Sequence, residues 1–210
     1  AGRAFCGGRR GGGEVTDAPA GASDRAQLDL PRRLRRLRRS PALRAMVRET
    51  RLSPDMFLYP LFVCSGQGQR REVASMPGVF QLSVDEVVKE AAAAKADGVL
   101  GVLLFGLPDS KDATGSAAWD SAAPVQSAIR ALKQELPDLL VVTDVCLCEF
   151  MSHGHCGIVR RDKSGARILN DPTLKLLART AASHAEAALR ASTRAGGICE
   201  RGAMLWVADI

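Results

Sequence analysis

The sequence predicts an α/β fold in which helices cover a parallel β-sheet. Three short segments are almost wholly apolar, as expected for strands buried on both faces: 58–63, 99–105 and 139–145. Segments with a helical spacing of apolar residues separate these strands and follow the last one. A doubly wound sheet and a closed barrel both fit this alternation. No G-x-G-x-x-G motif follows the first strand, which removes the main support for a dinucleotide-binding fold.

Each predicted helix carries a start or stop signal. Ser83 and Glu86 have the spacing of a capping box, directly before a stripe of valines and alanines. The next helix has its large apolar residues on one side, and Pro137 ends it. Asp171 is the expected N-cap of the third helix, with Pro172 in its first turn.

Composition excludes several classes of protein. The 210 residues are 46% hydrophobic and 25% charged, values that are ordinary for a globular domain. No run of 18 apolar residues occurs, so we expect no membrane-spanning helix and no membrane partner. Six cysteines are too few and too clustered for a disulfide scaffold. Their clustering points instead to metal chemistry in a reducing compartment.

The N-terminal part of the chain differs from the rest in composition. Residues 1–30 are rich in glycine and poor in large apolar groups, so we interpret them as a disordered leader. We expect a cytoplasmic protein, with an organelle such as a plastid as the alternative if this leader is a transit peptide. Residues 31–57 form a basic arm, with nine arginines between Arg32 and Arg51. No aromatic residues lie among these arginines, so we expect the arm to dock on a partner subunit rather than on nucleic acid.

Three cysteines near the end of the third strand suggest a metal site. Cys146 and Cys148 share one side of the strand if it continues, and the turn at Gly154 can return Cys156 to them. Three thiolates suit zinc, and a set of three protein ligands leaves a fourth position open, as in catalytic sites. The neighbouring histidines are the alternative fourth ligand, which would close the site. The carboxyl end of a strand is where a barrel places its chemistry.

The cysteine segment has a specific likeness. Asp144 to Cys148, with Ser152 to Gly157, resembles the zinc-binding signature of the porphobilinogen synthase (delta-aminolevulinic acid dehydratase) family. Other segments resemble the same family in the same order: 40–44, 59–63, 75–79 and 111–116. The resemblance covers roughly residues 31–187.

This resemblance implies a particular architecture and assembly. Residues 58–187 correspond to the first half of a (β/α)8 TIM-type barrel, and residues 31–57 to an arm that embraces a neighbouring subunit in a homo-octamer. Residues 188–210 form a divergent tail that does not match the family, although Met204 to Val207 could form a further strand.

The resemblance also implies a reaction. The family condenses two molecules of 5-aminolevulinate to porphobilinogen, with loss of two waters, in tetrapyrrole biosynthesis. In its zinc-dependent branch the metal lies on the cysteines that correspond to Cys146, Cys148 and Cys156. Asp144 corresponds to an acid that lines the same site, and His155 to a histidine associated with an accessory zinc.

The lysines do not complete this site. The family uses two Schiff-base lysines in the second half of its barrel. None of the six lysines of this chain matches them, and we expect Lys89, Lys95, Lys133 and Lys175 on solvated helix faces. The 210-residue chain is therefore expected to be inactive by itself. The alternative is a non-catalytic fragment of the same family that binds zinc or a partner subunit.

Overall fold

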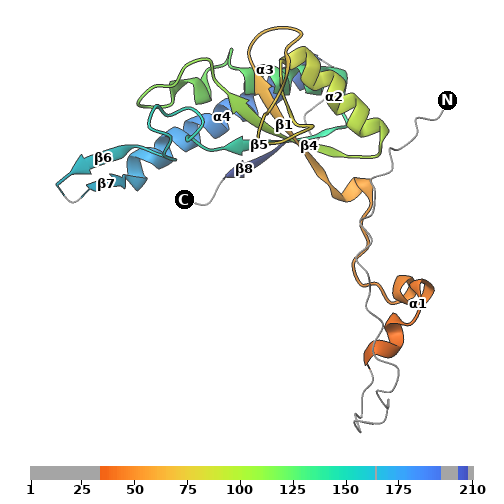
Figure 1. Ribbon diagram of the computed structural model, residues 1–210. Helices are drawn as coiled ribbons and strands as arrows, with labels where there is room; N and C mark the ends of the chain where they lie inside the picture. The colour runs from red at the N-terminus through yellow and green to blue at the C-terminus, as the bar shows by residue number, and fades with distance from the viewer. Residues whose placement is uncertain (1–33, 164, 195–202, 208–210) are drawn as a thin grey trace. The chain divides into compact units, whose positions relative to one another are not determined.

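The computed structural model describes residues 34–163, 165–194 and 203–207 (Figure 1). It divides the chain into two compact units, residues 1–51 and 52–210. The predicted leader, residues 1–30, lies outside the described residues, as do positions 195–202 and 208–210 of the divergent tail.

The first unit contains two short helices, η1 (Leu34–Arg38) and α1 (Pro41–Met46). The helix α1 begins at Pro41 because Ser40 caps it, accepting a 3.2 Å hydrogen bond from the Leu43 amide. No residue of α1 is buried, and the side chain of Met46 is 77% exposed. The apolar residues of this helix therefore have no core of their own.

The second unit is built on a six-stranded sheet in the order β2-β3-β1-β4-β5-β8. Every neighbouring pair is parallel except β2 and β3. The strands are β1 (Leu58–Cys64), β2 (Arg70–Glu72), β3 (Phe80–Leu82), β4 (Gly101–Leu107), β5 (Leu140–Val145) and β8 (Ala203–Val207). The three predicted strands are thus confirmed as β1, β4 and β5. The tail contributes β8, which extends the sheet beside β5.

The helices show that the sheet is not doubly wound. Three long helices follow the strands: α2 (Val84–Ala96), α3 (Pro124–Glu135) and α4 (Asn170–Arg194). All three pack into one core with Leu61, Val102 and Leu104 of the sheet, so they cover the same face. A doubly wound sheet would divide them between two faces. Strands β1, β4, β5 and β8 are neighbours in chain order, which is the topology of a barrel segment.

The opposite face of the sheet is only partly covered. Phe62 and Phe105 are half-buried there and stack across β1 and β4, with ring centroids 5.5 Å apart. Asp144 lies on the same face as Phe105, because Thr143 pairs with Leu104 and side chains alternate along a strand. The Asp144 side chain therefore projects on the face away from the helices.

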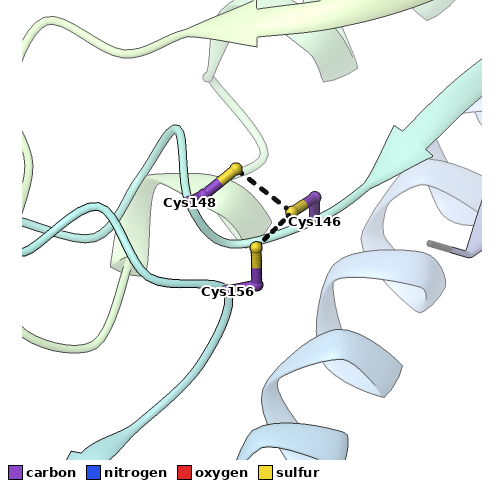
Figure 2. Close-up of side chains that lie close together, drawn as sticks. All are labelled: Cys146, Cys148 and Cys156. Atoms are coloured by element: carbon purple, nitrogen blue, oxygen red, sulfur yellow. Dashed lines mark hydrogen bonds between the residues drawn. The ribbon is translucent and has the colours of Figure 1, made fainter. Parts of the chain in front are cut away.

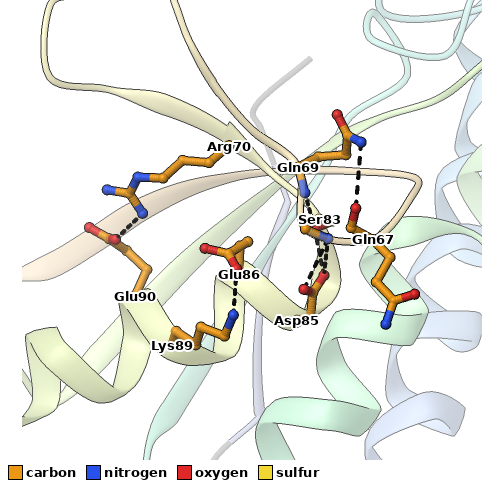
Figure 3. Close-up of polar contacts among 9 residues, drawn as sticks. Gln67, Gln69, Arg70, Ser83, Asp85, Glu86, Lys89 and Glu90 are labelled. Atoms are coloured by element: carbon orange, nitrogen blue, oxygen red, sulfur yellow. Dashed lines mark hydrogen bonds and ion pairs between the residues drawn. The ribbon is translucent and has the colours of Figure 1, made fainter.

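Polar contacts hold the start of α2 against the loop before β2 (Figure 3). Ser83 is the N-cap residue, but its side chain accepts no bond from an amide of its own helix. Its hydroxyl donates to the Asp85 carboxylate and accepts from the Gln69 amide at 2.9 Å. The predicted capping box is therefore wrong in its bonding, although α2 begins where it was expected. The Gly68 amide donates to the Asp85 carboxylate at 3.0 Å, which fixes the loop to the helix.

The remaining elements are short. A two-stranded antiparallel hairpin of β6 (Val159–Asp162) and β7 (Gly165–Ile168) follows the cysteine segment. Two 3-10 turns, η2 (Pro54–Met56) and η3 (Ser116–Trp119), precede β1 and α3. Within the described parts of the chain, every helix is too short or too polar to cross a bilayer.

Candidate metal centre

Three cysteine thiols meet just beyond the carboxyl end of β5 (Figure 2). The Cys146 sulfur lies 3.3 Å from the Cys148 sulfur and 3.5 Å from the Cys156 sulfur. All three sulfurs lie within 4.8 Å of one another. The structure thus brings together the three residues that the sequence selected.

The loop between Cys148 and Cys156 is folded by its own backbone. The Phe150 and Met151 amides donate to the Leu147 carbonyl at 3.0 and 2.8 Å, and the Gly154 amide donates to the Met151 carbonyl at 3.1 Å. Leu147, Phe150 and Met151 are buried in a second, smaller core. Gly154 has a φ of +72°, a conformation that side chains disfavour, so the glycine permits the turn that returns the chain to Cys156.

The donor set fits zinc. A tetrahedral ion with metal–sulfur distances of about 2.3 Å separates its sulfurs by about 3.8 Å, a few tenths of an ångström more than observed here. Cys146 is buried and Cys148 half-buried, and this burial raises the pKa of both thiols. Buried thiols next to one another lose their protons readily only to a metal, whose charge compensates the thiolates.

Two carboxylates lie beside the thiols. Oxygens of Asp144 and Glu149 lie within 4.8 Å of each other and of the Cys146 sulfur. Burial raises the pKa of Asp144. Burial, and secondly the charge of Asp144, raise the pKa of Glu149 to about 7. Sequence reasoning selected Asp144 but missed Glu149. Glu149 lies in the turn after Cys148, and the spacing of residues in the sequence does not predict where a side chain in such a turn points.

The histidines lie outside this group. His155 is exposed, and its amide donates to Nδ1 of His153 at 3.2 Å. Among the described residues, no histidine shares a cluster of three or more metal-binding side chains. The geometry therefore does not assemble the closed site with a histidine as fourth ligand. An accessory zinc on His155 stays a prediction.

The third histidine has a different environment. His184 on α4 is buried against β5, with Nδ1 3.1 Å from the Thr143 hydroxyl. Its Nε2 has no hydrogen-bond partner in the described structure. Burial lowers the pKa of His184 to about 4, so the ring is neutral at pH 7.

The environments of the lysines match the expectation only in part. Lys89 and Lys175 are exposed, as expected, and Lys89 forms an ion pair with Glu86 at 2.6 Å. The expectation for Lys133 is wrong: it is buried, and its ammonium donates to the Leu139 carbonyl at 2.8 Å. Its long apolar stem lies in the core while the charged end satisfies a carbonyl at the start of β5.

Comparison with known proteins shows the family of this chain. Residues 31–193 match the family model of delta-aminolevulinic acid dehydratase. The chain belongs to this family. The resemblance read from the cysteine motif is therefore confirmed, and so is the α/β fold of a barrel family.

The relatives are longer than this chain. Delta-aminolevulinic acid dehydratase of Halalkalibacterium halodurans is 51% identical over 156 residues, which are 74% of this chain and 46% of the relative. The protein of that name from Synechococcus elongatus is 49% identical over 155 residues, 74% of this chain and 48% of the relative. The chain thus spans about half the length of the curated relatives it matches.

A solved structure shows the same fold. It is delta-aminolevulinic acid dehydratase (porphobilinogen synthase) of Toxoplasma gondii in complex with the reaction product porphobilinogen. The two structures superpose with a TM-score of 0.69 at 33% sequence identity, over 76% of this chain and 45% of that one.

Proposed function

We propose that this chain is the metal-binding half of a porphobilinogen synthase. The complete active site would condense two molecules of 5-aminolevulinate to porphobilinogen and release two waters, as a step of tetrapyrrole synthesis. The observation that carries this proposal is the set of three thiols at the carboxyl end of β5. The Cys148 and Cys156 sulfurs both lie within 3.5 Å of the Cys146 sulfur. The reaction is that of the family, and we assign it to this chain because the three thiols can bind the metal ion that the reaction would use.

Cys146, Cys148 and Cys156 would hold a zinc ion. When bound, zinc supplies a Lewis acid that polarises a substrate oxygen or a water molecule. With three thiolates as its ligands, the ion would keep one coordination position for substrate or water. No histidine of the described chain lies in the group, and the carboxylates of Asp144 and Glu149 lie beside it. Such a site would be of the open, catalytic kind.

Asp144 and Glu149 lie where they could transfer protons next to the fourth coordination position of the zinc ion. Both carboxylates lie within 4.8 Å of the Cys146 sulfur, and both are half-buried. Carboxylates at this distance could accept or donate protons next to the coordination position. We assign Asp144 to the lining of the substrate site, with Glu149 beside it.

The assembly and location follow from the same assignment. The basic segment 31–57 would serve as the arm that embraces a neighbouring subunit in a homo-octamer. We place the reaction in the cytoplasm, with an organelle as the site if residues 1–30 act as a transit peptide.

The proposal is tested on the protein as its cells produce it. An intact mass above the 22.3 kDa of this sequence, with porphobilinogen formed from 5-aminolevulinate, would support it. A thiol-selective zinc chelator should abolish turnover, and added zinc should restore it. Cys156→Ser should lose activity, while Cys64→Ser, a cysteine outside the cluster, should keep it.

A second candidate is a non-catalytic fragment that binds zinc or a partner subunit. The six lysines are the observation behind it: Lys89, Lys111, Lys163 and Lys175 are exposed, Lys95 is half-buried, and Lys133 donates to a backbone carbonyl. A Schiff-base lysine needs a desolvated pocket or a cationic neighbour. A mass at or below 22.3 kDa, with zinc bound and no turnover, would favour this candidate over the enzyme.

A further inference from the structure

A five-residue turn in the loop after β4 is organised around one carboxylate. Asp112 accepts hydrogen bonds from the Thr114 amide at 2.7 Å, the Thr114 hydroxyl at 3.0 Å and the Ser116 amide at 3.2 Å. It also accepts one from the Ser116 hydroxyl. These donors stabilise the ionised carboxylate and hold the pKa of Asp112 far below its usual range. Asp112 is exposed, so these hydrogen bonds rather than burial fix the shape of the turn.

The same residue contacts the cysteine loop through its backbone. The Asp112 amide donates to the Phe150 carbonyl at 3.3 Å, and its carbonyl accepts from the Ser152 amide at 2.8 Å. These two bonds form a parallel bridge between Asp112 and Met151. The bridge lies between Cys148 and Cys156, on the segment that must turn back for the third thiol to reach the other two.

The turn and the loop are also in close van der Waals contact. Gly115 has a φ of +68°, and a β-carbon there would lie 3.3 Å from that of Phe150 and 3.6 Å from the Met151 side chain. Only glycine combines this backbone conformation with this approach. The Asp112 carboxylate bonds on both sides of Gly115, so it holds the turn in the shape that fits the loop.

Cys156 is anchored on its C-terminal side by the chain at Ile158, whose amide donates to the Thr173 hydroxyl at 3.0 Å. It is exposed, unlike Cys146, which is buried at the end of β5. The position of its sulfur therefore depends on this anchor and, on the N-terminal side, on the backbone path between Met151 and Cys156. A bonded anchor at Met151 shortens the free segment and lowers the ordering entropy that metal binding must overcome.

We propose that Asp112 is a positioning residue of the metal centre: its turn clamps the cysteine loop at Met151 and so places Cys156 beside Cys146. This inference rests on the proposed function, since it assumes that the three thiols bind zinc. Outer groups that orient metal ligands change metal affinity by about 10–100-fold when they are removed. Asp112 acts at longer range, through the backbone, so the lower end of that range applies.

The test measures zinc affinity of the full 210-residue chain, reduced, by competition with a chromophoric chelator. Asp112→Ala should weaken zinc binding about tenfold, and Ser116→Ala, which removes one donor, should weaken it less. Asp112→Asn keeps an acceptor oxygen and should recover part of the loss. Asp120→Ala is the matched control, because Asp120 also accepts an amide bond in an exposed turn but lies after η3.

The absorption spectrum of bound Co²⁺ is a second measurement, and a loss of folding stability alone would not change it. The thiolate-to-cobalt absorption of Asp112→Ala should be reduced in intensity at saturating Co²⁺, as one sulfur is less firmly held, while Asp120→Ala keeps the wild-type spectrum. If Asp112→Ala does not fold, as judged by circular dichroism, Ser116→Ala decides the question by the same two measurements.

The outcomes separate this inference from the proposed function. If Asp112→Ala, or Ser116→Ala in its place, binds zinc and cobalt as the wild type does while Cys156→Ser does not, the positioning role is wrong and the zinc site stands. If the wild-type chain binds zinc no better than its Cys146→Ser variant, the zinc assignment fails and the positioning role fails with it.

Discussion

Two regions of the second unit are built in different ways. The helix-covered sheet (β1, β4 and β5 with α2, α3 and α4) is held by one continuous core whose central side chains are fully buried. The carboxyl-end loops (residues 108–116 and 146–157) have a small core and are held largely by backbone and carboxylate hydrogen bonds. Stability and chemistry are thus assigned to separate parts of the chain. Substitutions in one region should leave the property of the other nearly unchanged.

The largest expected effect is on metal binding, in the carboxyl-end loops. Cys148→Ser should weaken zinc binding at least about 100-fold, since apparent zinc binding energies of about 10–16 kcal/mol are shared among about four ligands. The free energy of unfolding of the metal-free chain should change by less than about 1 kcal/mol. Chelator competition and urea unfolding measure the two quantities. An equally large loss of stability without metal would break the comparison between the regions.

The opposite substitution is made in the helix-covered sheet. Leu104 of β4 is fully buried, so Leu104→Ala should lower the free energy of unfolding by about 2–5 kcal/mol. Zinc affinity, measured where the variant is still folded, should stay within about twofold. Leu174→Ala on α4, where the side chain is 55% exposed, is the control and should cost less than about 0.5 kcal/mol. Loss of zinc binding by Leu104→Ala would show that the regions are coupled.

The pH dependence of stability tests the helix-covered sheet at the contact between β5 and α4, where His184 is buried. Burial lowers the pKa of His184 to about 4, below the value of about 6.5 expected in the unfolded chain. The unfolded state therefore binds the proton first, and stability present above pH 6.5 is lost as the pH falls toward 4. The loss from this group between pH 7 and pH 4.5 should be about 2 kcal/mol.

Urea unfolding at these two pH values isolates the effect of His184. His184→Gln should be less sensitive to acid than the wild type by about that amount, whereas the exposed His155→Gln should keep the wild-type sensitivity. Equal sensitivity of His184→Gln and the wild type would mean that the buried ring does not resist protonation.

The smallest expected effect comes from a surface ion pair at the edge of the sheet. Arg70 and Glu90 lie 2.7 Å apart, and their side chains are 40% and 23% exposed. Arg70→Gln should lower the free energy of unfolding only slightly, because water and salt screen such pairs. Thermal unfolding at low and high salt measures this, and zinc affinity should not change. A loss of stability as large as that of Leu104→Ala would mean that this ion pair contributes as much as a buried core residue.

The helix-covered sheet was largely predictable because its signals are local. Apolar runs gave β1, β4 and β5 to within two residues, and apolar periodicity gave α2 and α3. The short strands β2 and β3 were missed, since Arg70–Glu72 is polar and a sheet edge needs no apolar alternation. The β6–β7 hairpin was missed as well, although the sequence Asp162 to Gly165 contains the residues typical of a tight turn.

The candidate site was predictable only in part. The cysteines stand out because thiols in this spacing have few other uses. The link from Asp112 to Met151 joins residues far apart in the chain through backbone atoms, and no side-chain pattern records such a bond. Glu149 and the partner of His184 were missed for the same reason, since burial and contact are properties of the folded chain.

The central claim is an open zinc site made by three cysteines, and X-ray absorption at the zinc edge tests it most directly. The zinc-loaded 210-residue chain should show three sulfurs at about 2.3 Å and one oxygen at about 2.0–2.2 Å. The same measurement on Cys156→Ser should show one sulfur fewer. Two sulfurs or fewer in the wild-type chain would contradict the claim. A nitrogen with the scattering of an imidazole ring would show that a histidine closes the site.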